Sequence, residues 1–200
     1  MSTERKQTRP TLHPGVALCS PYAQGAVDNT CGLYAALNAI CLASAPIRPL
    51  SMTDARCVMT AGLAHLQRHD WLSSVLIHGM TLQRQRSVML RMARAAEQTV
   101  GGIGVNLSPL LRGGSQLTTE MVLQRISERI AEGAAIVACL EKTHWHFTVI
   151  AGLSERRIYL FDSDGLQWIE RRAFGISAAR SQARHCVPRS SLIAVDVVAK

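Results

Sequence analysis

The hydrophobic pattern of this chain changes character near residue 134. Before that point apolar residues recur at helical spacing, and after it short apolar runs separated by tight turns are typical of strands. Helices are predicted over residues 30–43, 51–69, 81–98 and from 118 or 119 to a stop at Gly133. Strands are predicted over residues 134–140, 146–152, 157–163, 166–170 and 191–198. Because helices followed by closely spaced strands favour segregated layers, we expect an α+β fold with an antiparallel sheet.

Local signals place the ends of these helices. Asn29 or Thr30 is expected to cap the first helix, and the Ser51-Met-Thr-Asp54 stretch resembles a capping box for the second. The glycine-rich segment 100–114 is interpreted as a connection with room for one short strand, and the basic segment 171–190 as a loop.

The length of 200 residues predicts one domain. We expect a flexible polar tail over residues 1–15 and a single domain over residues 16–200. The most apolar stretch, residues 31–47, is interrupted by Gly32, Asn38, Ser44 and Pro46, so no membrane span is expected.

The chain carries a net charge of +8. Its basic residues are scattered rather than grouped, which favours a solvated surface over a nucleic-acid site. Aromatic residues make up 4% of the chain, fewer than a base-stacking platform needs. Nucleic acid is therefore not an expected partner, and the sequence leaves the oligomeric state open.

Six cysteines are present without any CxxC pair. This spacing gives no support to a zinc finger or a thioredoxin-like redox pair. The N-terminal segment has no apolar core of a secretory signal. We expect free thiols in a protein that is cytoplasmic, or exported without a cleavable signal peptide.

Cys31 stands at the start of the first predicted helix. Free amides and the positive end of the helix dipole favour a thiolate there. The Cys31 N–H could also donate to an oxyanion, and Gly32 leaves the space beside the sulfur open. Alone, the same position is more typical of an ordinary buried cysteine.

Three further polar residues suit a nucleophilic thiol. His146 opens a predicted strand and could exchange protons with the thiol, and Asp162 ends the next strand, where it could orient the imidazole. Gln24 lies seven residues before Cys31 and could donate a second hydrogen bond to an oxyanion. The order Gln24, Cys31, His146, Asp162 thus assigns one role to each residue.

These residues carry a resemblance to a known superfamily. Gln24 and Asn29-Thr30-Cys31-Gly32, on a helix that also carries Asn38, resemble the nucleophile region of papain-like cysteine peptidases. The likeness is closer to the peptidase domains of bacteriocin-exporting transporters and their bacterial relatives, and the pattern is also similar to Josephin-type deubiquitinating peptidases. The run His146-Phe-Thr-Val-Ile-Ala-Gly152 resembles the histidine strand of the superfamily. The stretch that begins at Asp162 stands where those enzymes carry an Asn-Ser-Trp-Gly or Asp-Pro stretch.

The resemblance covers residues 20–40 and 120–170, and residues 45–118 match no family pattern. It implies a papain-like α+β domain in which a helical lobe carries the nucleophile and packs on an antiparallel sheet. The implied activity is that of a cysteine peptidase acting on a peptide or isopeptide bond of a peptide or protein, without a cofactor. Cys31 would be the nucleophile, His146 the base, Asp162 its orienting carboxylate and Gln24 an oxyanion donor.

Other readings of the same residues remain open. An amine in place of water would make the site an acyltransferase or transglutaminase, and a basic surface without catalysis would make the chain a binding module. His144 and His146, with Asp162 or Cys31, could instead ligate zinc, although no second spaced pair supports this. The Gly-x-Gly near residue 102 lacks the strand–turn–helix context of a nucleotide site.

Overall fold

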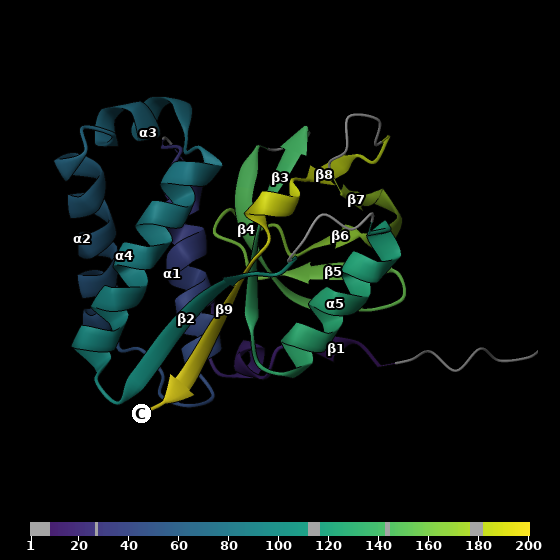
Figure 1. Ribbon diagram of the computed structural model, residues 1–200, viewed down its shortest axis with the longest axis horizontal. Helices are drawn as coiled ribbons and strands as arrows, with labels where there is room; N and C mark the ends of the chain where they lie inside the picture. Colours follow the sequence, from purple (N-terminus) through teal and green to yellow (C-terminus); the bar gives the residue numbers. More distant parts are fainter. Residues whose placement is uncertain (1–8, 27, 112–116, 143–144, 177–181) are drawn as a thin grey trace, which may run out of the picture.

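The computed structural model consists of a helical lobe and a sheet lobe that lie side by side (Figure 1). It describes residues 9–26, 28–111, 117–142, 145–176 and 182–200. Helices α1 to α4 form the helical lobe, and α5 covers the outer side of the sheet. The α+β class expected from the order of helices and strands is confirmed.

Five α-helices are present in the described part of the chain. They are α1 (Cys31–Ser44), α2 (Met52–Arg68), α3 (Leu72–His78), α4 (Leu82–Val100) and α5 (Thr119–Ala131), with 3-10 turns η1 (Pro14–Ala17), η2 (Arg171–Ala173) and η3 (Arg189–Ser191). The four predicted helices are confirmed, whereas the seven-residue α3 was not predicted. Helix α3 is shorter than the span over which a helical period can be recognised.

The expected helix starts are largely confirmed. Ser51 and Asp54 form the predicted capping box of α2, and the Thr118 side chain caps α5. The first helix differs from expectation. Thr30 occupies the N-cap position of α1 without a capping hydrogen bond from its side chain, and Asn29 bonds to a different element.

The sheet combines nine strands of the described chain. Its main path runs β2 (Ile103–Pro109), β9 (Ile193–Ala199), β3 (Ala135–Lys142), β4 (His146–Leu153), β5 (Arg157–Leu160) and β6 (Trp168–Glu170). These neighbours are all antiparallel, as expected. The segment 100–114 does contain a strand, β2, which pairs along its whole length with β9.

The basic segment near the C-terminus differs from the sequence interpretation. The segment 171–190, expected to be a loop, contains β7 (Phe174–Ile176) and β8 (His185–Val187), which pair in parallel with each other, and β8 also joins β3. The three-residue strands are too short to show an alternating pattern, and tertiary pairing defines them.

The segment expected to be a polar tail, residues 1–15, lies partly outside the described residues, and its later part is folded. Strand β1 (Thr11–Leu12) pairs with β4, and the next residue, His13, is 1% exposed and bonds through Nε2 to Gly133 O at 2.8 Å. A Cβ on Gly152 would lie 2.4 Å from a Leu12 side-chain atom, so this close strand approach requires glycine. Residues from Thr11 onward are therefore part of the fold.

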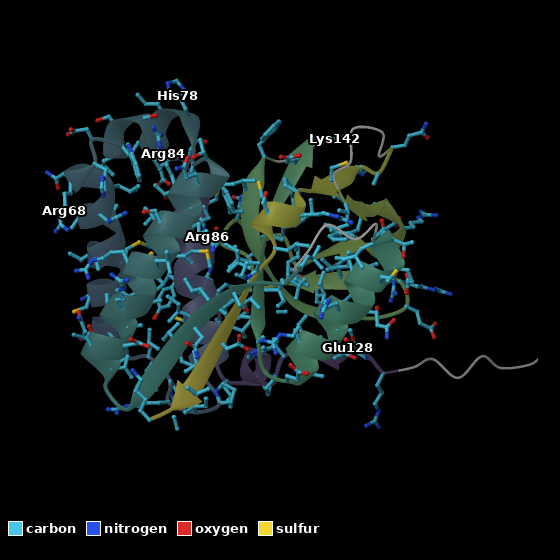
Figure 2. All side chains as sticks on the ribbon, viewed as in Figure 1. Arg68, His78, Arg84, Arg86, Glu128 and Lys142 are labelled. Atoms are coloured by element: carbon cyan, nitrogen blue, oxygen red, sulfur yellow. The ribbon has the colours of Figure 1, made fainter. Side chains whose placement is uncertain are left out.

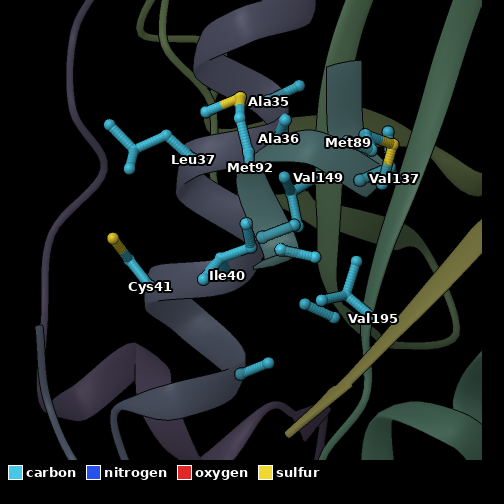
Figure 3. Packing of buried hydrophobic residues seen from close by; sticks show 14 of the residues in the cluster. Ala35, Ala36, Leu37, Ile40, Cys41, Met89, Met92, Val137, Val149 and Val195 are labelled. Atoms are coloured by element: carbon cyan, nitrogen blue, oxygen red, sulfur yellow. The ribbon is translucent and has the colours of Figure 1, made fainter. Parts of the chain in front are cut away.

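Helix α1 lies at the centre of the core. All but one of its residues are buried, because α2 and α4 cover one side and strands β3, β4 and β9 the other. Figure 3 shows Ile40 near Met92, Val149 and Val195. A helix that is apolar on every side is typical of complete burial. In the described residues, no helix is long and apolar enough to cross a membrane.

Candidate active site

The cysteine assigned as nucleophile is the first residue of α1. Cys31 is 7% exposed, and the residue before it is held by Asp28, whose Oδ1 accepts from Thr30 N at 3.0 Å and from the Thr30 hydroxyl. The first amides of a helix have no acceptor within that helix, so the α1 start offers N–H donors beside the sulfur. The dipole of this 14-residue helix adds a positive field at the same place.

Asn29 fixes the helix start to a second element. Its Nδ2 donates to Leu76 O at 3.1 Å and to Ile77 O at 2.9 Å, both near the end of α3. Helix α3 is therefore attached two residues before Cys31. His78 at the end of α3 and Lys142 at the end of β3 lie at the same end of the molecule (Figure 2).

His146 and Asp162 meet at the junction of two adjacent strands. His146 is the first residue of β4 and Asp162 follows β5 by two residues, and His146 Nε2 lies 2.7 Å from Asp162 Oδ2. The second carboxylate oxygen, Oδ1, accepts from Asp164 N at 2.8 Å and from Leu166 N at 3.2 Å. Because both oxygens are bonded, the carboxylate has one fixed orientation behind the imidazole.

The imidazole bridges Asp162 and Cys31. Burial of His146 would lower its pKa, but the hydrogen bond to Asp162 and the charge of that carboxylate, together with the nearby Cys31 side chain, raise the pKa to about 10. Since Nε2 bonds to Asp162, the other ring nitrogen, Nδ1, is the one left for the thiol. The structure thus brings Cys31, His146 and Asp162 together between the lobes, with His146 hydrogen-bonded to Asp162 and close to Cys31.

The Asp162 carboxylate remains ionised although it is buried. Burial would raise the pKa of Asp162, but the hydrogen bond and the charge of His146 hold the pKa below its ordinary value. The Thr148 hydroxyl, on the same face of β4 as His146, lies near enough to lower it further without the full geometry of a hydrogen bond. A charged Asp162 favours a cationic imidazole beside the thiol.

Ser163 connects Gln24 to the group formed by Cys31, His146 and Asp162. Gln24 N donates to Ser163 O at 3.0 Å, and the Ser163 hydroxyl donates to Gln24 Oε1 at 3.3 Å. Ser163 directly follows Asp162, so Gln24 is held against the histidine side of the site. With Oε1 engaged by Ser163, the amide nitrogen of Gln24 is the atom that could serve as a donor to an oxyanion.

Asn38 has no assigned role in the sequence pattern, and in the structure it connects α1 to the segment that leads to Gln24. It is fully buried on α1, and its carboxamide bonds to the backbone of Tyr22, two residues before Gln24. A polar side chain in an otherwise apolar helix is the signal that could have revealed it. The contacts of Ser163 and Asn29 gave no such signal, because their partners are distant in sequence.

A hollow opens on the histidine side of the site. It has a cavity volume of about 260 Å³ and is lined by His146, Asp164, Gly165 and Leu166. Asp164 is exposed and stands in the turn after Asp162, as its Asp-Gly context predicts. Trp145, beside His146, is 71% exposed. The hollow therefore reaches His146 from this side.

The zinc alternative rests partly on a residue outside the described ones, His144. Among the described residues, no group of three or more histidine, cysteine, aspartate or glutamate side chains could hold a metal ion. The six cysteines all have free thiols. Comparisons of the chain with protein-family models, with curated proteins and with solved structures gave no match.

Proposed function

We propose that this protein is a papain-like cysteine peptidase that hydrolyses a peptide or isopeptide bond through an acyl-enzyme. The observation that supports the proposal is the position of His146, which bonds to Asp162 at 2.7 Å and also lies close enough to the Cys31 thiol, at the start of a helix, for the thiol to raise the imidazole pKa. Nucleophile, base and orienting group within mutual reach are the arrangement that nucleophilic catalysis requires.

In the first half of the proposed reaction, the Cys31 sulfur attacks the substrate carbonyl carbon while His146 holds the thiol proton. The carbonyl oxygen becomes an oxyanion, which accepts from the Cys31 N–H and from the Gln24 amide nitrogen. When the C–N bond breaks, His146 gives its proton to the departing amine, and a thioester remains on Cys31.

In the second half, His146 removes a proton from water as the water oxygen attacks the thioester carbonyl. The C–S bond then breaks, the carboxylic acid leaves, and the proton returns to the Cys31 sulfur. Asp162 orients the imidazole and stabilises its cationic form in both halves. No cofactor is required by these steps, and the free thiols of the chain suit a reducing compartment.

The test is digestion of a proteome-derived peptide library with the wild-type protein and with Cys31→Ala. New peptide ends that appear only with the wild type would support the peptidase. Transfer of acyl groups onto an added amine, without hydrolysis, would replace it with an acyltransferase. No Cys31-dependent product of either kind would favour the non-catalytic binding module.

A further inference from the structure

A buried glutamine beside the nucleophile has no role in the mechanism above. Gln85 lies in the first turn of α4 and is 1% exposed, and neither Oε1 nor Nε2 has a hydrogen-bond partner among the described residues. Each buried polar atom left without a partner costs about 1–3 kcal/mol. An apolar side chain of similar length would avoid that cost, so this residue is not explained by stability.

The unpartnered amide points at the start of the nucleophile helix. A Cβ on Gly32 would lie 2.4 Å from Gln85 Oε1, so the carboxamide occupies the space that the absent side chain of Gly32 leaves. Gly32 follows Cys31 directly, and the same Cβ would lie 3.2 Å from the sulfur of Met80. The polar amide and the flexible Met80 side chain therefore converge on the position next to the thiol.

We propose that Gln85 is a specificity-determining residue that binds the backbone peptide group on the acyl side of the substrate. The inference rests on the proposed function, because it takes Cys31 to be the attacked site. A carboxamide with both a free donor and a free acceptor is complementary to a peptide group, whose N–H would donate to Oε1 and whose carbonyl would accept from Nε2.

This role selects a class of substrate. The acyl group that reaches Cys31 must continue into at least one further peptide bond, so blocked peptides are favoured over single amino-acid amides. Met80 is half-buried and unbranched, and this role requires its flexible side chain to move aside so that the peptide group reaches Gln85. Binding of the peptide then supplies the partners that Gln85 lacks in the free protein.

The experiment compares Gln85→Met with Gln98→Met, an exposed glutamine on the same helix. The probe is the blocked peptide acetyl-Ala-Ala-Gly-Gly-amide, whose binding is measured by calorimetry in the Cys31→Ala background, where turnover cannot interfere. We expect Gln85→Met to weaken this binding about 10-fold, the equivalent of 1.4 kcal/mol for the lost hydrogen bonds. Gln98→Met should leave binding within about twofold, since it touches no site residue.

Two further readouts separate a binding role from a structural one. With Cys31 present, Gln85→Met should keep the iodoacetamide reactivity of Cys31 within about twofold. Its melting temperature should equal or exceed that of the wild type, because an unpartnered polar group has been removed.

Binding of the blocked peptide that does not depend on Gln85, or no binding at all, would overturn the inference. A lower melting temperature together with slower alkylation would also overturn it and assign Gln85 a structural role. Gln85-dependent binding without hydrolysis by the wild type would instead contradict the peptidase proposal and leave the Gln85 site standing.

Discussion

Asn38 and Tyr22 form a two-point contact that joins helix α1 to the loop of Gln24. Tyr22 N donates to Asn38 Oδ1 at 2.8 Å, and Asn38 Nδ2 donates to Tyr22 O at 3.1 Å. Asn38 lies two helical turns beyond Cys31, so one rigid element positions both the sulfur and the loop that carries the proposed oxyanion donor.

Asn38→Ala should lower both stability and turnover. The substitution leaves the Tyr22 N–H and C=O without their side-chain partners, which predicts a loss of about 1–3 kcal/mol in the free energy of unfolding. Because the Gln24 loop loses its anchor, kcat should fall more than KM rises. Denaturant unfolding and steady-state kinetics measure the two effects.

Ser44→Ala is the matched control for this prediction. Ser44 is a second buried polar residue of α1, and its hydroxyl bonds to Cys41 O at 3.1 Å, within the same helix. Its loss should reduce stability without affecting kcat. Equal effects of the two substitutions on kcat would show that Asn38 acts only through general stability.

Cys31 should be the most reactive of the six thiols. Burial raises the pKa of Cys19 and raises the pKa of Cys41 and Cys139 to about 12, which leaves few reactive thiolates at these positions near neutral pH. Labelling with sub-stoichiometric iodoacetamide, followed by mass mapping, should place the label on Cys31. Cys57 is exposed and is the internal comparison; labelling of Cys57 or Cys41 to the same extent would contradict the prediction.

The pH dependence of the reaction should follow His146. Its pKa is raised to about 10, above the value of 6.5 for a free histidine, so the imidazole of the folded protein stays protonated through neutral pH. We expect kcat/KM to fall as the pH rises through about 10, where the leaving amine loses its proton donor. The stability contributed by His146 should be complete below about pH 6.5 and should be lost as the pH rises through about 10.

His146→Ala should abolish turnover and slow the alkylation of Cys31 near pH 7, because the proton acceptor of the thiol is lost. His144→Ala is the comparison, since His144 is the neighbouring histidine in the sequence. If His144→Ala abolished turnover and His146→Ala did not, the assignment of the base would be wrong by two residues.

Asp162→Asn should lower the rate and move the alkaline limb to lower pH. Asp162 raises the pKa of His146 through a hydrogen bond and a negative charge, and the substitution removes the charge. In the wild type the pKa of Asp162 is held below its ordinary value. The stabilising effect of the Asp162 carboxylate is therefore present above about pH 3.8, and it is lost as the pH falls through the lowered pKa. This acid-side dependence should also weaken in Asp162→Asn, as measured by unfolding at several pH values.

Asp164→Asn provides the control for Asp162→Asn. Asp164 lies in the exposed turn and contacts Asp162 through its backbone N–H, which the substitution retains. The pH profile should therefore stay in place. A larger loss of rate from Asp164→Asn than from Asp162→Asn would reverse the two assignments.

The sequence alone predicts those structural features that depend on residues close together along the chain. The capping box of Ser51 and Asp54 and the helix that begins at Cys31 follow from local spacing and were predicted. The proximity of His146 and Asp162 could also be predicted, because an antiparallel pair of consecutive strands constrains which residues face each other.

The remaining features depend on contacts between distant residues. Strand β1 has two residues, too few to show an alternating pattern, and the glycine that allows its pairing with β4, Gly152, is distant in the sequence. The bond between Gln24 and Ser163 joins residues 139 positions apart. The unpartnered amide of Gln85 becomes visible only when α4 packs against Gly32. No local pattern marks such contacts, which arise from tertiary packing.

The predicted substrate is an extended peptide that is cleaved after a small residue. An extended peptide fits a site between a helix and a sheet, and the enzymes that the motif resembles often cleave next to small residues such as a Gly-Gly pair. We therefore expect cleavage after a small residue, because a narrow site beside Cys31 would exclude larger side chains by steric clash.

The net charge of +8 should favour acidic peptides, chiefly by raising the association rate. Since added salt screens this attraction, kcat/KM for an acidic peptide should fall with ionic strength, whereas a lysine-rich peptide with the same scissile bond should show the opposite trend. Library digestion reports the cleaved residue, and the matched peptide pair at increasing salt tests the charge; cleavage only after large or basic residues would contradict the predicted specificity.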